Sequence, residues 1–123
     1  MNKTYLISGA VLGFLAVSTG AFGAHAFKVP LLAAGNLETY NTAVTYLFYH
    51  ALALIFTGML TREFGNKWNK YAGFSFITGS IIFSGSLFLI CLTGIKTFGA
   101  IAPIGGAFLI IGWLSSLRSF LVN

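Results

Sequence analysis

Four side chains that could take part in chemistry recur every four residues near the start of the second of four long apolar runs. They are Glu38, Thr42, Tyr46 and His50, and on a helix this spacing places them along one slowly drifting stripe. A neutral imidazole at the middle of a membrane can accept and pass on a proton, and Tyr46 and Thr42 would lead from it toward Glu38. The stripe therefore permits a proton path.

The same imidazole has a structural interpretation. It could bond a serine or a backbone carbonyl of the third apolar run and so fix the packing of two helices. We favour this second interpretation of His50, because no Asp, Glu, Lys or Arg lies deep in another run to continue a relay. A single intramembrane histidine makes a weak pathway.

Other reactive side chains are few. His25 ends the first run, and we expect it to make a polar contact with Glu38 near the membrane surface, with a pH-sensitive cap as the alternative. The two histidines, Glu38 and Cys91 show no ligand spacing such as C-x-x-C or H-x-x-x-H, so we predict no metal site. The serines lack a base, and only two carboxylates are present in the chain. We therefore predict no catalytic residues and no cofactor, and the chain is not expected to be an enzyme.

The composition is that of an integral membrane protein. The 123 residues are 57% hydrophobic and 7% charged, whereas a soluble domain has about 25% charged residues. Lipid must therefore be the solvent for most of the surface. The net charge of +5 reflects scarce acids, and the basic residues lie between apolar runs rather than in one patch, so we expect no nucleic-acid partner.

The apolar runs predict an all-α fold, a transmembrane four-helix bundle with short loops that forms a single domain over residues 1–123. Each run is long enough to cross a bilayer. We expect a short interfacial helix at Pro30 between the first two spans, and irregular backbone over 93–102 before Pro103 opens the last. Ala24-His25-Ala26 imitates a signal-peptide cleavage site, but cleavage would leave three spans, so we expect the first to be kept. The expected spans are 4–27, 37–61, 71–93 and 103–120.

Glycines follow three of the four runs at helical spacing and predict faces where helices pack closely. Three such faces exceed what one bundle needs, so we predict a homo-oligomer, with membrane lipids or another membrane protein as further partners. Trp113 lies too deep for an interfacial belt and is expected inside the bundle. The predicted packing positions are Gly9, Gly13, Gly20, Gly23, Gly79, Gly85, Gly105, Gly106 and Gly112.

The basic residues predict the orientation. With four spans, the two termini and the middle loop share a side that carries five basic residues, and the other side carries Lys28 and Lys96. The positive-inside rule then places both termini in the cytoplasm, in a multi-pass protein of the cell membrane, the inner or plasma membrane. The five are Lys3, Arg62, Lys67, Lys70 and Arg118.

Several stretches together resemble one family of small bacterial membrane proteins, the family named domain of unknown function 423, which is related to small mitochondrial transmembrane proteins of eukaryotes. The resemblance implies a four-span inner-membrane protein and no particular activity. The chain departs from the family pattern at Leu47, where a glutamine is expected, and at Ala102, where a threonine is expected. The matching stretches are Gly20-Ala-Phe-Gly-Ala-His-Ala26, Tyr46-x-x-x-His50-Ala-Leu-Ala53, Phe83-Ser-Gly-Ser-Leu87, and Pro103-x-Gly-Gly106 with Gly112-Trp113.

Two functional hypotheses follow. The first is a non-catalytic membrane component that packs with lipid, with itself or with another membrane protein. The alternative is a small channel or transporter for a proton, an ion or a small solute, with His50, Tyr46 and Thr42 lining its path and residues 94–102 at its mouth. A continuous wet cavity that reaches His50 would favour the alternative.

Overall fold

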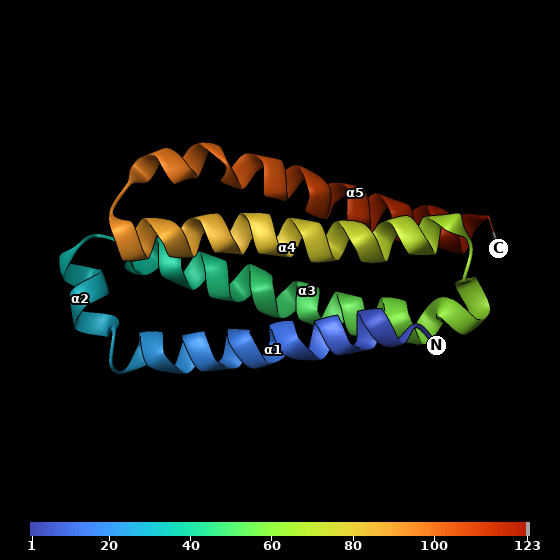
Figure 1. The fold of residues 1–123 in the computed structure, drawn as a ribbon, viewed down its shortest axis with the longest axis horizontal. Coiled ribbons are helices and arrows are strands. Elements are labelled where there is room, and N and C mark those ends of the chain that lie inside the picture. The colour runs from blue at the N-terminus through green and yellow to red at the C-terminus, as the bar shows by residue number, and fades with distance from the viewer. Residues whose placement is uncertain (123) are drawn as a thin grey trace.

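The chain forms four long helices that lie side by side, as a computed structural model of residues 1–122 describes it. Figure 1 shows the long helices in the spatial order α1, α3, α4, α5, so that α3 and α4 are the inner pair. Four helices are long and apolar enough to cross a membrane, which confirms the all-α membrane fold. The elements are α1 (Lys3–Ala24), α2 (Lys28–Ala33), α3 (Leu37–Phe64), α4 (Lys67–Thr93), the 3-10 helix η1 (Lys96–Ala100) and α5 (Ala102–Leu121).

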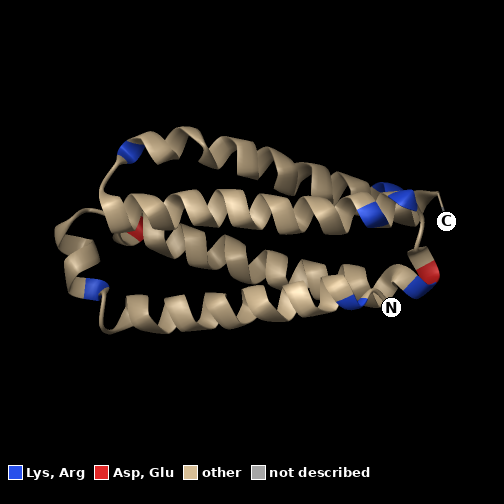
Figure 2. Ribbon diagram, viewed as in Figure 1, with Lys and Arg blue, Asp and Glu red and all other residues tan. Residues whose placement is uncertain are grey.

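The two ends of the helix bundle contain different elements of the chain. Both termini and the α3–α4 turn lie at one end, which we call the terminal end (Figure 1). The short helices α2 and η1 lie at the other, which we call the α2 end. Figure 2 shows that charged residues gather at these two ends and leave the length between them uncharged. This distribution suits helices whose middle sections lie in hydrocarbon.

Side-chain caps mark where two of the long helices, α1 and α4, begin. The Asn2 side chain accepts a hydrogen bond from the Tyr5 backbone N–H (3.2 Å) at the start of α1. The Asn66 side chain accepts from the backbone N–H groups of Trp68 (3.0 Å) and Asn69 (3.2 Å) and so opens α4. Such caps satisfy donors that a helix leaves without partners. Gly94 ends α4 in the left-handed conformation (φ +72°), which glycine adopts without strain.

The connections are shorter and more regular than expected. Because Asn66 caps α4 directly after Gly65 ends α3, both helices run through the charged stretch that the sequence suggested as a loop. Most of the stretch before Pro103, expected to be irregular over 93–102, is a 3-10 helix over Lys96–Ala100, with bonds such as Ile101 N–H to the Phe98 carbonyl (3.0 Å), while residues 94–95 are irregular. The expected short helix at Pro30 is present as α2.

Most of the predicted glycine positions lie where two helices of this chain meet. A Cβ on Gly9 would lie 2.8 Å from the Ala51 carbonyl oxygen of α3, and one on Gly112 would lie 2.6 Å from the Phe76 ring of α4. Gly85 is an exception, since nothing lies within 4 Å of its Cβ position. Gly85 therefore packs closely on no other helix of this chain, and a packing role against another molecule stays a prediction. The other close approaches are Gly20 to Val44, Gly23 to Tyr40, Gly79 to Leu109 and Gly105 to Phe83, while Gly13 and Gly106 make ordinary contacts.

Candidate functional site: a histidine–tryptophan pair in an open groove

A groove runs between α3 and α5, with α4 as its floor. The two helices contact each other over only a short length, whereas α5 packs closely on α4. The groove has a volume of about 600 Å³ and is lined mainly by aromatic and aliphatic side chains. Its lining residues are Tyr46, Tyr49, His50 and Leu52 of α3, Phe83 of α4, and Gly106, Leu109, Ile110 and Trp113 of α5.

His50 is the buried polar group of this groove, with 5% of its surface exposed. Its Nε2 lies 3.0 Å from Nε1 of Trp113, and its Nδ1 lies 2.7 Å from the backbone oxygen of Tyr46. An indole N–H can only donate, so Nε2 of His50 must be the acceptor. The ring proton is then on Nδ1 and is donated to the Tyr46 carbonyl. His50 is therefore held as a neutral imidazole with both nitrogens bonded.

Aromatic rings surround this pair. Phe76 of α4 lies with its ring centroid 5.7 Å from that of His50 and 5.2 Å from that of Trp113. Tyr46 packs on Phe83, with the ring centroids 4.7 Å apart. These contacts join α3, α4 and α5 at one level. The His50–Trp113 pair therefore lies on closely packed aromatic rings of α4.

Trp113 is not inside the bundle, contrary to the expectation from its depth in the sequence. Its side chain is 53% exposed. The preceding Gly112 faces α4, and the next residue on a helix points about 100° away from it. The indole therefore stands on the wall of the groove, with its N–H toward His50 and part of its surface open. The His50 partner is also on the fourth long helix, not on the third as the sequence suggested.

The polar stripe follows the surface of α3 toward the α2 end. Glu38 is exposed, Thr42 is half-buried and Tyr46 is 42% exposed. Tyr46 lines both the α3–α5 groove and a shallow groove that Glu38 and Thr42 also line. Among the described residues, however, no two of these four side chains bond to each other; Thr42 donates to the Glu38 backbone carbonyl (3.0 Å). The stripe is a row of separate polar groups.

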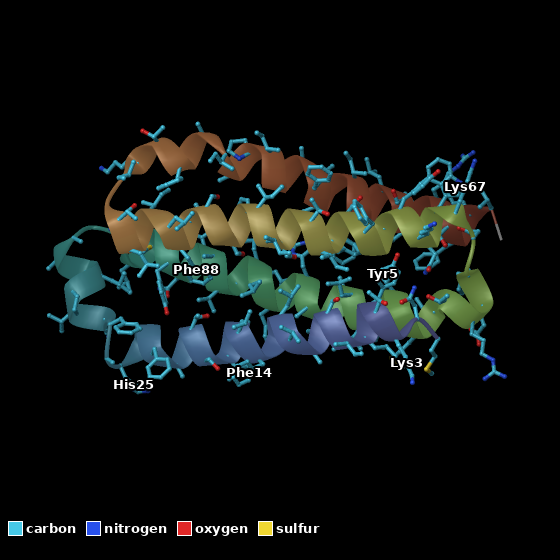
Figure 3. All side chains as sticks on the ribbon, in the orientation of Figure 1. Lys3, Tyr5, Phe14, His25, Lys67 and Phe88 are labelled. Carbon is cyan, nitrogen blue, oxygen red and sulfur yellow. The ribbon has the colours of Figure 1, made fainter. Side chains whose placement is uncertain are left out.

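His25 and Glu38 do not meet. His25 is exposed at the turn after α1 (Figure 3), and within residues 1–122 no hydrogen bond or ion pair joins it to Glu38. The expected contact between them is wrong, because the helix α2 separates the turn from the start of α3. In the same part of the chain, no three side chains of the His, Cys, Asp and Glu types lie close enough to hold a metal ion together.

Sequence reasoning missed a polar link at the terminal end. Asn69, with 5% of its surface exposed, donates to the Thr57 backbone carbonyl (3.2 Å) and accepts from the Thr61 hydroxyl (3.1 Å). This link joins α4 to α3. Its signal was hidden because Asn69 fell within an expected loop. For Trp113 a signal existed, since an indole N–H at membrane depth requires an acceptor.

Comparison with known proteins identifies the family of this chain. The family model described as "Protein of unknown function (DUF423)" matches residues 19–106, more than half of the chain. The chain belongs to this family. Within the DUF423 family match lie α2, α3, α4, η1 and the first turn of α5, so both the polar stripe and the floor of the groove fall inside it. No solved structure matches the chain significantly.

The relatives agree on a membrane location. The UPF0382 membrane protein SAB0533 of Staphylococcus aureus is 42% identical over 112 residues, which cover 91% of this chain and 90% of the relative. The UPF0382 membrane protein YwdK of Bacillus subtilis is 38% identical over 115 residues, which cover 91% of each chain. This DUF423 chain is thus a membrane protein with four candidate spans.

Proposed function

We propose that this chain is a non-catalytic component of the cell membrane, with both termini in the cytoplasm, and that its α3–α5 groove receives the acyl chains of membrane lipids. The observation that carries the proposal is the His50–Trp113 bond (3.0 Å). Because the His50 ring nitrogens bond the Trp113 indole N–H and the Tyr46 backbone carbonyl, these polar atoms at the centre of the groove need no partner from an occupant. Acyl chains match such a surface.

The position and composition of the groove support this proposal. His50 lies about halfway along α3, so the groove is level with the middle of the hydrocarbon core. Leu52, Phe83 and Ile110 provide its apolar lining. The excess of basic residues at the terminal end supports cytoplasmic termini.

A second copy of the chain is the competing occupant. The glycine faces that suggested a homo-oligomer are used within one chain, since Gly9 and Gly23 pack on α3 and Gly105 and Gly112 pack on α4. They no longer argue for self-association. An oligomer would then have to use another surface, and the groove is one concave surface at mid-depth.

Fluorescence quenching of Trp113 tests the proposal. In a Trp68→Phe chain Trp113 is the remaining tryptophan, and it is half exposed in the groove. After reconstitution into lipids brominated along the acyl chain, we expect strong quenching, greatest for bromines near the chain ends, because those lie near mid-bilayer. A Gly106→Leu change adds a side chain to the groove and should reduce it. Trp113 shielded from bromine at every depth would show that protein, not lipid, fills the groove.

One observation favours the channel or transporter as a second candidate. Tyr46 lines both the shallow groove at Glu38 and Thr42 and the groove at His50, so polar side chains occur at intervals from the α2 end to mid-depth. It ranks second because His50 has no free nitrogen to exchange a proton: Nε2 accepts from Trp113 and Nδ1 bonds the Tyr46 carbonyl. Proton or ion flux is the property that separates the two candidates.

A further inference from the structure

Two basic side chains lie over one indole ring at the terminal end, and a third lies nearby on the same helix. The Nζ of Lys67 lies 5.2 Å from the ring centroid of Trp68, and the Cζ of Arg118 lies 5.5 Å from the same centroid. Lys67 begins α4 and Arg118 is in the last turn of α5, so two helices bring positive charge to one ring. Lys70 is one turn further along α4 and is exposed.

A groove begins at this ring and continues toward the membrane interior. Its volume is about 470 Å³. The Tyr5 hydroxyl donates to the Lys70 backbone carbonyl (3.0 Å) and so closes the groove on the α1 side; Figure 3 shows Tyr5 and Lys67 at the same end of the molecule. Lys70 and Trp68 line the groove, and Lys67 and Arg118 lie over the Trp68 ring, so basic groups lie beside one end of the groove. It is lined by Tyr5 of α1, by Trp68, Lys70, Tyr71, Phe74 and Ser75 of α4, and by Ile111 and Ser115 of α5.

The arrangement is complementary to an anionic lipid: its positive charges lie at the membrane surface, where a headgroup phosphate would be, and its apolar side chains lie below, where an acyl chain would be. Like charges placed on one ring repel each other, and a phosphate beside Lys67 and Arg118 would offset that repulsion. Trp68 and Tyr71, with ring centroids 5.5 Å apart, are residue types that favour the headgroup level. Basic pockets between membrane helices at the cytoplasmic surface are known to hold such headgroups.

We propose that this groove is a binding site for one anionic phospholipid. Lys67, Lys70 and Arg118 bind the headgroup phosphate, and Tyr71, Phe74 and Ile111 contact an acyl chain. Ile111 and Trp113 are two residues apart on α5 and so point to nearly opposite sides of it. The site is therefore separate from the α3–α5 groove and does not rest on the function proposed above.

The test uses Trp68 as the reporter. In a Trp113→Phe chain Trp68 is the remaining tryptophan. The chain is reconstituted into phosphatidylcholine bilayers that contain the same mole fraction of either brominated phosphatidylglycerol or brominated phosphatidylcholine. We expect the anionic lipid to be preferred over phosphatidylcholine next to Trp68 by at least about fivefold, which is the effect of one basic side chain at an anionic surface.

Charge variants identify the residues responsible. Lys67→Gln, Lys70→Gln and Arg118→Gln together should abolish the preference, while Lys67→Arg with Lys70→Arg should keep it. A matched control, Lys28→Gln with Lys96→Gln, removes two charges at the α2 end and should leave it unchanged. All five side chains are exposed, so these changes spare the core. Equal quenching by the two lipids, or a preference that survives loss of the three basic residues, would overturn the proposal. Suppression of the preference by soluble glycerol phosphate would show that the headgroup alone is bound, and would overturn the acyl-chain part.

Discussion

Replacing Gly105 by alanine should lower the free energy of unfolding by about 1–3 kcal/mol, the usual cost of adding a methyl group to a tightly packed site. A Cβ at Gly105 would meet the backbone nitrogen of Phe83 and lie 2.7 Å from its Cα. Backbone atoms cannot rotate away, so α5 would have to move off α4. Unfolding of the purified chain in mixed micelles, followed by its helical circular dichroism, measures the effect.

Gly106 provides the matched control. It is the next residue on the same helix, and its Cβ would lie 3.8 Å from the Phe83 ring, an ordinary contact. Alanine has a higher helix propensity than glycine by about 1 kcal/mol, so Gly106→Ala should be neutral or slightly stabilising. Equal losses of stability at both positions would show that α5 does not pack on α4 through Gly105.

Removing either partner of the His50–Trp113 pair should destabilise the chain by about 1–3 kcal/mol, the cost of leaving a buried polar group without its bond. Trp113→Phe leaves Nε2 of His50 without its donor, and His50→Phe leaves the indole N–H without its acceptor. Ring bulk is approximately kept in both. The same unfolding measurement on both variants checks the prediction.

The double variant isolates the pair itself. Hydrogen bonds between membrane helices contribute about 0.6 kcal/mol on average and up to about 1.7 kcal/mol. With His50→Phe and Trp113→Phe combined, the total loss should therefore fall short of the sum of the single losses by about 1 kcal/mol. Strictly additive losses would mean that the two side chains do not interact in the membrane.

The fold could be predicted from the sequence because its causes are local. Apolar length and scarce charge depend on composition along the chain, and they predicted the four long helices. Pro30, a residue suited to the first turn of a helix, predicted the short helix α2. The predicted positions of the helix ends were less accurate. A cap such as Asn66 is a single side chain whose effect depends on which backbone N–H groups it meets, so the extension of α4 back to Lys67 was not visible.

The site was predicted only in part because its geometry depends on helix rotation. The spacing of Glu38, Thr42, Tyr46 and His50 placed them on one face, but not the angle at which that face meets its neighbours. The sequence suggested a serine of α4 as a hydrogen-bond partner of His50. Ser84 instead donates to the Ala43 carbonyl of α3 (2.8 Å). Its actual partner is Trp113. Predicting this partner would have required the rotation of α5 about its axis, in which Gly112 faces α4 and the indole of Trp113 faces the groove.

The central claim is that His50 joins helices and does not conduct. Proton and ion flux in proteoliposomes tests it most directly, with wild type, His50→Phe and Trp113→Phe compared in vesicles of one composition. Trp113→Phe frees Nε2 of His50, so a relay through this imidazole would gain flux in that variant. We predict that none of the three exceeds protein-free vesicles. Flux in wild type that is lost in a folded His50→Phe chain would contradict the claim and make His50 part of a conducting path.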